Sequence, residues 1–135
     1  DIVFAADWDM ELIGLDVTSH ISCDAGDFKT LASQSPDIGG FLDRISQFYI
    51  TFYHGVIGRH VCLMHDPSAV ISITNHAVFD YETIALEVVC SGEQIGATIR
   101  TDKTRRPVKV AKQVNAATVR KIFLDICSQC DKIKS

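Results

Sequence analysis

Three consecutive residues, His65, Asp66 and Pro67, have the side chains and the spacing to do chemistry. An imidazole titrates near neutral pH, and beside a carboxylate it can pass a proton to a leaving group or sit next to a metal ion. The same residues also suit the start of a helix, because Asp66 is a good N-cap and Pro67 fits the first helical position. Taken alone, the tripeptide favours helix capping over catalysis.

The five cysteines are the other residues with reactive side chains: Cys23, Cys62, Cys90, Cys127 and Cys130. Their spacing does not match a disulfide framework, so we expect reduced, partly buried thiols, as is usual in a cytoplasmic protein. Cys127 and Cys130 have C-x-x-C spacing, which leaves a thiol or zinc site as an alternative. No second pair of ligands follows them, so a zinc site lacks partners.

The composition limits the possible partners. The chain has 135 residues, of which 47% are hydrophobic, and this is enough for one core, in one domain or a piece of one. Its net charge of -4 argues against nucleic acid and anionic membranes, since both bind a basic face. The one basic segment, from Lys103 to Lys112, is expected to be a solvated hairpin edge. No apolar run approaches the ~18 residues of a membrane span, and we expect a cytoplasmic location.

The elements that precede the tripeptide are expected to position it. Residues 1–8 are typical of the end of a helix whose beginning is absent. The apolar run from Glu11 to Val17 is typical of a strand covered on both faces in a parallel sheet. Residues 18–20, which include His20, would then lie at the carboxyl end of that strand, where open α/β sheets bind ligands. A short helix is predicted around residues 28–32.

The clearest helix follows Ser35, Pro36 and Asp37, which are typical of a helix start. Apolar residues then recur at spacings of three and four, which places them on one face: Ile38, Phe41, Leu42, Ile45, Phe48, Tyr49 and Phe52. We expect packing in the core to explain this stripe without any cofactor. Tyr53 and His54 lie at the far end of the helix and face the loop that leads to His65.

The second half of the chain predicts a β region and a final helix. Residues 82–90 and 94–100 are expected to form a β-hairpin around the turn at residues 91–93. A further strand is predicted from Val108 to Val114, and Asn115 is expected to cap the closing helix. That helix carries its own apolar stripe, formed by Val119, Ile122, Phe123, Ile126, Cys127 and Cys130.

Several of these parts, in this order, resemble the carboxyl-terminal part of the inosine-uridine preferring nucleoside hydrolases. The parts are Leu15-Asp16-Val17-Thr18, the long helix ending in Tyr53, His65-Asp66-Pro67-Ser68-Ala69-Val70, the hairpin with Gly96, and the stretch from Val108 to Asp125. The resemblance implies an α/β fold: the carboxyl-terminal portion of an open, mostly parallel sheet with flanking helices and an added antiparallel hairpin. Residues 1–135 would be one segment of a single domain whose amino-terminal part is absent.

The resemblance also implies an activity and a set of site residues. The family is a calcium-dependent group that cleaves the bond between ribose and base of purine or pyrimidine nucleosides. Asp66 matches its metal-binding aspartate, and His65 matches the catalytic histidine near the departing base. Tyr53 and His54 become candidates for binding substrate, since the loop before the motif often closes over it. In that mechanism calcium holds the sugar hydroxyls and a water, which a carboxylate activates.

The departures from the family are as informative as the matches. The aspartate-rich metal signature and the asparagine-containing stretch that binds ribose are both absent from this chain. Calcium takes about six to eight oxygen ligands, so Asp66 alone cannot build the site. The usual Asp-Val-Thr-His reads here as Asp16-Val17-Thr18-Ser19-His20, which leaves the role of His20 open.

Two readings of function remain. The first is a nucleoside hydrolase segment that is inactive alone and needs its amino-terminal portion, in the same or a companion chain. The intact protein is then expected to be a homo-oligomer. The second is a non-catalytic remnant or interaction module with the same packing. Because a parallel sheet without its other strands exposes apolar surface, we expect the isolated segment to be unstable or to associate.

Overall fold

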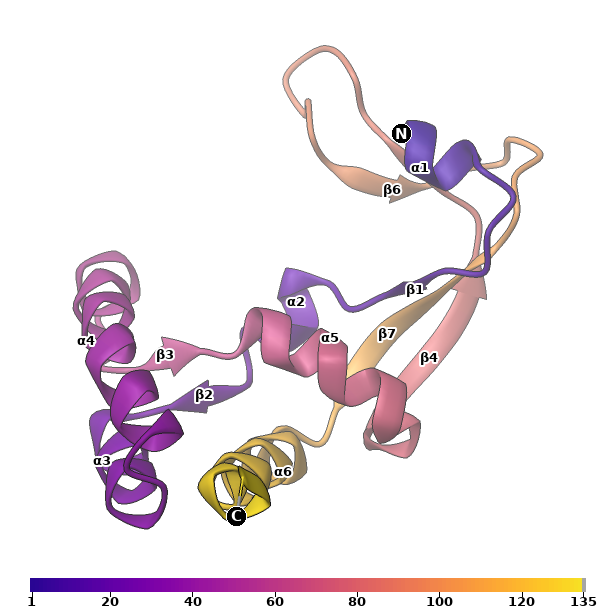
Figure 1. The fold of residues 1–135 in the computed structure, drawn as a ribbon. Helices are drawn as coiled ribbons and strands as arrows, with labels where there is room; N and C mark the ends of the chain where they lie inside the picture. The colour runs from indigo at the N-terminus through magenta and orange to yellow at the C-terminus, as the bar shows by residue number, and fades with distance from the viewer. Residues whose placement is uncertain (135) are drawn as a thin grey trace.

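A computed structural model describes residues 1–134, and Ser135 lies outside the described residues. The elements are spread over an extended arrangement (Figure 1), with helices α3 and α4 at one end and strands β5 and β6 at the other. The prediction of an α/β fold with flanking helices and an antiparallel hairpin is confirmed. No helix of the described residues is long and apolar enough to cross a membrane.

A three-stranded sheet holds the middle of the molecule together. Its strands are β1 (Glu11–Leu12), β7 (Val108–Val114) and β4 (Phe79–Ile84), in the order β1-β7-β4. β1 runs parallel to β7, while β4 is antiparallel to it. The strand predicted over residues 108–114 is therefore confirmed, and β1 has the expected parallel pairing.

The strand predicted from Glu11 to Val17 is wrong beyond Leu12. Residues Leu15–Thr18 form a short helix, α2, which follows Gly14. Gly14 accepts the backbone N–H groups of Val17 and Thr18, and Asp16 lies in the first helical turn, where a negative charge is favoured. The chain therefore leaves the sheet at Gly14, and Thr18 lies at the end of a helix instead of a strand.

Two helices and a small two-stranded antiparallel sheet form one end of the molecule (Figure 1). These elements are α3 (Ala25–Gln34), α4 (Ile38–Ile57), β2 (Ser22–Cys23) and β3 (Cys62–Leu63). Asp24 and Asp27 form a capping box at the start of α3. The backbone of Gly39 lies so close to α3 that a Cβ there would come within 2.2 Å of the Leu31 carbonyl oxygen. The close approach of the two helices at this point thus requires glycine at position 39.

The prediction that the α4 stripe packs in the core is wrong for most of its members. Five of them are between 45% and 71% exposed: Phe41, Ile45, Phe48, Tyr49 and Phe52. The buried residues of α4 are Gly39, Ser46 and Ile50, which lie on a different face. The hydrophobic spacing is real, but among residues 1–134 no element covers the outer part of this face.

Helix α5 (His65–Thr74) follows β3 and crosses the centre of the molecule (Figure 1). The cap position belongs to Met64, and no side-chain hydrogen bond caps the helix. The prediction that Asp66 is the N-cap and Pro67 the first helical residue is therefore wrong by two positions. Asp66 instead lies in the first turn, where its charge still suits the helix dipole. A short 3-10 turn, His76–Val78, leads into β4.

The predicted hairpin is present as β5 (Leu86–Val88) paired with β6 (Thr98–Arg100), with shorter strands and a longer loop. The prediction is wrong for residues 82–84, which belong to β4 and pair with β7. The amino-terminal helix α1 (Ile2–Ala5) lies beside it (Figure 1). The basic segment is not simply solvated, because the Arg105 side chain is only 11% exposed and binds Asp1, with a nitrogen-to-oxygen distance of 2.6 Å. Arg106 pairs with Asp7 and Asp9 at 2.7 and 2.5 Å.

The closing helix α6 (Ala116–Cys127) lies against the centre of the fold. Asn115 caps it as predicted, its side chain accepting the Thr118 N–H at 3.1 Å. Val119 is 1% exposed, and Ile122, Phe123 and Cys127 pack against the core, whereas Ile126 is 54% exposed. The stripe predicted on this helix is thus mostly covered. The chain then continues into a 3-10 turn, Cys130–Lys134.

Candidate functional site

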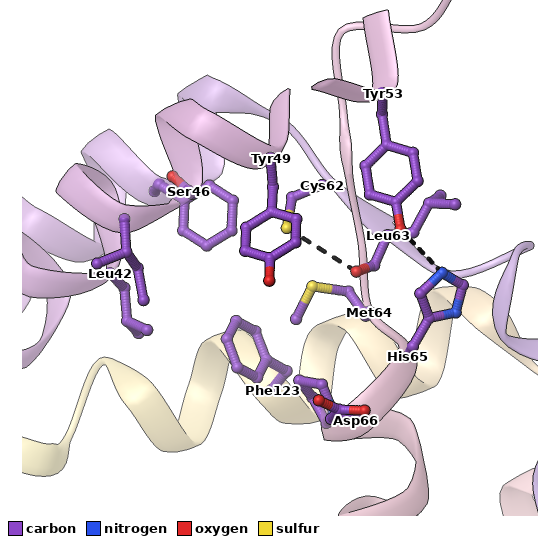
Figure 2. Close-up of a pocket in the computed structure, with 13 residues that line it drawn as sticks. Leu42, Ser46, Tyr49, Tyr53, Cys62, Leu63, Met64, His65, Asp66 and Phe123 are labelled. Atoms are coloured by element: carbon purple, nitrogen blue, oxygen red, sulfur yellow. Dashed lines mark hydrogen bonds between the residues drawn. The ribbon is translucent and has the colours of Figure 1, made fainter. Parts of the chain in front are cut away.

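A cavity of about 420 Å³ lies between α4, β3, the start of α5 and α6 (Figure 2). Its wall is mostly apolar and aromatic, with a small number of polar groups, as is usual for ligand pockets. The residues that line it are Phe28, Leu42, Ile45, Ser46, Tyr49, Tyr53, Cys62, Leu63, Met64, His65, Asp66, Pro67 and Phe123. Ile45 and Tyr49, two members of the exposed stripe, therefore face this cavity.

His65 is the first residue of α5 and is held at both ring nitrogens. Its Nε2 lies 3.1 Å from the Tyr53 hydroxyl of α4, and its Nδ1 lies 2.6 Å from Thr18 Oγ1 at the end of α2. Figure 2 shows the Tyr53 side chain pointing down from its helix toward the imidazole. Three helices thus fix the orientation of one imidazole.

Asp66 follows His65 on the same wall of the cavity (Figure 2). Its carboxylate is exposed and makes no capping hydrogen bond, so its oxygens can reach a ligand. The structure therefore brings together three of the four residues singled out in the sequence: Tyr53, His65 and Asp66.

The fourth residue, His54, is not among those that line the cavity. It is exposed in the last turn of α4, where its ring stacks on His60 with 3.8 Å between the ring centroids. His20 is also separate from the cavity. It borders another depression, beside Asp27 and Arg120. Neither histidine shares the pocket of His65.

Burial raises the pKa of two side chains of the cavity wall, Tyr53 and Cys62. Loss of contact with water raises the pKa of the Tyr53 hydroxyl, and the neighbouring Cys62 and Tyr49 add to this effect. Burial likewise raises the pKa of the Cys62 thiol. A tyrosine hydroxyl is protonated at neutral pH even without this shift, so Tyr53 can donate a hydrogen bond to His65.

The cysteines are all free thiols. Burial raises the pKa of Cys127 to about 11, and the Cys130 thiol donates to the Ile126 carbonyl with a sulfur-to-oxygen distance of 3.4 Å. Across residues 1–134, no group of three or more histidine, cysteine, aspartate or glutamate side chains could hold a metal ion. This geometry gives no support to a zinc site at the C-x-x-C pair.

Comparison with known proteins places the chain in a family. The family model described as inosine-uridine preferring nucleoside hydrolase matches residues 1–121. The chain belongs to this nucleoside hydrolase family. A probable uridine nucleosidase 2 of Arabidopsis thaliana is 26% identical over 136 residues, which are 93% of this chain and 42% of the relative.

Solved structures agree with this membership. A purine-preferring ribonucleoside hydrolase from Gardnerella vaginalis matches with a TM-score of 0.89 and 26% identity, over 98% of this chain and 44% of the other. A plant nucleoside hydrolase has the same TM-score at 22% identity, over 95% and 44%, which shows the fold. This member of the nucleoside hydrolase family thus spans less than half the length of the relatives it matches.

One partner of His65 was missed by sequence reasoning. Thr18 was expected at the end of a strand, with no partner named, yet its hydroxyl contacts His65. Its expected place at the end of a strand was wrong, because Leu15–Thr18 form a helix, so that expectation was not a valid signal for the contact. The contact joins residues 47 positions apart, which no local pattern reveals.

Proposed function

We propose that the protein hydrolyses the bond between ribose and base of ribonucleosides, and that these 135 residues supply the side of the active site that meets the departing base. The observation that carries this proposal is the imidazole of His65, held between Thr18 and Tyr53 beside Asp66 in the cavity wall. Membership of the nucleoside hydrolase family supports it.

His65 is the proposed general acid. When the bond between sugar and base breaks, the base takes the electron pair, and a proton delivered to the base makes it a better leaving group. The sugar then carries positive charge, as in other glycosidic cleavages. Tyr53 is proposed to hold the imidazole from the cavity side and to contact the base, because its side chain lines the cavity.

Asp66 is the proposed calcium ligand of this chain. A calcium ion takes about six to eight oxygens, and no second carboxylate joins Asp66 in a ligand group among residues 1–134. The residues present therefore do not fit a complete calcium site. We infer that the other ligands come from elsewhere in the same protein or from a companion chain, and that the 135 residues alone are inactive.

We also infer the assembly state, the compartment and suitable test substrates of the intact protein. The uncovered apolar face of α4 favours association, which supports a homo-oligomer in the intact protein. The free thiols support a reducing compartment such as the cytoplasm. The relatives are named for uridine and for purines, so inosine and uridine are both suitable test substrates.

The test is a nucleoside hydrolysis assay with these 135 residues alone and joined to the amino-terminal part of the family fold, with and without calcium. We expect hydrolysis only in the joined protein with calcium. His65→Gln should then lower kcat by about 10²- to 10⁴-fold, most strongly for poor leaving groups. His76→Gln, an exposed histidine bound to Glu11, is the matched control and should leave kcat unchanged.

Each outcome decides one part of the proposal. Hydrolysis by the 135 residues alone would show that the site is complete within them. No hydrolysis by the joined protein would favour a non-catalytic module. Equal rates for His65→Gln and the unsubstituted protein would remove His65 from the role of general acid.

A further inference from the structure

The Thr18 hydroxyl is a buried polar group that contacts His65 on the side away from Tyr53. The residue is 1% exposed, and its Oγ1 lies 2.6 Å from Nδ1 of His65. The same hydroxyl donates to the carbonyl oxygen of Gly14, one helical turn earlier, at 3.2 Å. A hydroxyl has one proton and can also accept, so the direction of that proton decides the form of the imidazole.

We propose that Thr18 is a positioning residue that keeps the proton on Nδ1 of His65 and so holds Nε2 toward the Tyr53 hydroxyl and the cavity. This inference rests on the proposed role of His65 as general acid. It adds a residue from α2, a helix that contributes no residue to the cavity wall, and this residue acts from behind His65.

The hydrogen-bond directions support one arrangement over its reverse. With its proton directed at Gly14, Thr18 offers a lone pair that accepts Nδ1–H, and Nε2 is then free to accept from the Tyr53 hydroxyl. If Thr18 instead donated to Nδ1, its single proton would no longer bond the Gly14 carbonyl. Only the first arrangement keeps both hydrogen bonds of the hydroxyl.

The helix around Thr18 holds the hydroxyl in place. A threonine side chain is stiff at χ1, and its Oγ1 bonds the carbonyl four residues earlier. The backbone N–H of Thr18 bonds the same Gly14 carbonyl at 3.0 Å, which anchors the turn. The orientation of the hydroxyl is thus built before any substrate arrives.

The proton balance of the step follows. As the bond between sugar and base breaks, the electron pair moves to the base. The Tyr53 hydroxyl, 3.1 Å from Nε2, gives its proton to the base and takes the proton of Nε2. The proton on Nδ1 stays on its nitrogen, bonded to Thr18. A water proton restores Nε2 after the base departs. In histidines generally, the hydrogen-bond partner of one ring nitrogen determines which of the two nitrogens carries the proton.

The test is nitrogen NMR of the histidine rings in the protein labelled with ¹⁵N-histidine, with the His65 signals assigned by their loss in His65→Gln. We expect the neutral His65 ring to carry its proton on Nδ1 in the unsubstituted protein and in Thr18→Ser. In Thr18→Val, which removes the hydroxyl and keeps the shape, we expect the proton to move mainly to Nε2.

Thr30→Val is the matched control. Thr30 makes the same bond to a glycine carbonyl four residues earlier, Gly26, at 2.8 Å, and it lies on α3 without a histidine partner. Its substitution should leave the His65 ring unchanged. In the joined, active protein, Thr18→Val should lower kcat with little change in KM, and Thr18→Ser should restore it.

The outcomes separate this inference from the proposed function. A His65 ring protonated on Nε2 in the unsubstituted protein, or an unchanged ring in Thr18→Val, would overturn the role of Thr18. If Thr18→Val does not fold, the spectrum of the unsubstituted protein decides alone. A protein without hydrolase activity that still shows the Thr18-dependent proton position would contradict the proposed function and leave the ring assignment intact.

Discussion

Helices α4 and α6 carry apolar stripes of similar spacing, but only the stripe on α6 is mostly buried. On α6 the stripe begins with Val119, which is 1% exposed, and the helix packs against α3, α5 and β2. On α4 the stripe ends in open surface, with Phe48 71% exposed. Hydrophobic spacing therefore predicts which face a helix would bury, while the neighbouring elements determine whether that face is buried.

The difference has a functional side. α6 contributes mainly packing, with Phe123 at the floor of the cavity, whereas α4 carries Tyr53 and bonds His65. Ile45 and Tyr49 of the exposed stripe line the same cavity. An apolar face that is left partly open next to a polar pair is the composition expected of a ligand pocket.

The largest expected effect is on the covered face of α6. Val119→Asp would place a charge among buried apolar groups and should lower the free energy of unfolding by about 4 kcal/mol or more. Urea unfolding followed by circular dichroism measures this. The matched change on the same helix is Ile126→Asp, at a position that is 54% exposed, which should have a small effect. Equal losses for the two variants would contradict the assigned covered face.

The second largest effect on stability concerns the face of α4 that packs against α3. Gly39→Ala would bring a Cβ within 2.2 Å of the Leu31 carbonyl oxygen of α3, so one helix must move. We expect a loss of about 3 kcal/mol in the free energy of unfolding.

Gly55→Ala, on the same helix with nothing within 4 Å of the new Cβ, is the control for Gly39→Ala. It should stabilise the protein by about 0.5–1 kcal/mol, because alanine is the better helix former. A harmless Gly39→Ala would mean that α3 and α4 are not in close contact.

A third, smaller effect concerns alkaline pH and the covered face of α6. Burial raises the pKa of Cys127 from 9.0 to about 11 in the folded protein. Between these pH values the unfolded chain loses the thiol proton and the folded protein keeps it, so stability falls as pH rises through this window. Urea midpoints across the window should fall more steeply for the unsubstituted protein than for Cys127→Ala. Parallel curves would place Cys127 in contact with water.

Much of the fold was predictable because local signals determine it. Asn115 caps α6, and Val108–Val114 form β7, as their residue types indicate. Gly14 ends β1 early, and this was missed because an apolar run favours a strand whether or not a glycine interrupts it. The order of the parts around His65 identified the family. The sequence also placed Tyr53 at the end of a helix that faces the loop before His65, and the two side chains are in contact in the structure.

The remaining parts depend on distant contacts. The bond between Thr18 and His65 forms only when α2 and α5 come together, and the composition of neither segment encodes it. The exposure of the α4 stripe was not predictable either. A stripe shows that a helix has an apolar face. Whether other elements of residues 1–134 bury that face depends on the whole fold.

The smallest expected effect on stability concerns the exposed stripe of α4. Phe48→Asp, on the open stripe of α4, should change the free energy of unfolding by less than about 0.5 kcal/mol, because the ring is 71% exposed. The same change should reduce association, since a charge in an apolar patch opposes its burial against another surface. Sedimentation at several protein concentrations would show association for the unsubstituted protein and less for Phe48→Asp.

Lys29→Asp is a control for Phe48→Asp, because it places a similar negative charge on an exposed position of α3. It should leave association unchanged, so a loss specific to Phe48→Asp would locate the contact on the stripe. A loss of stability comparable to that of Val119→Asp would instead mean that the stripe is covered in the folded chain. The two helices would then not differ, and the α4 face would be part of the core that the sequence predicts.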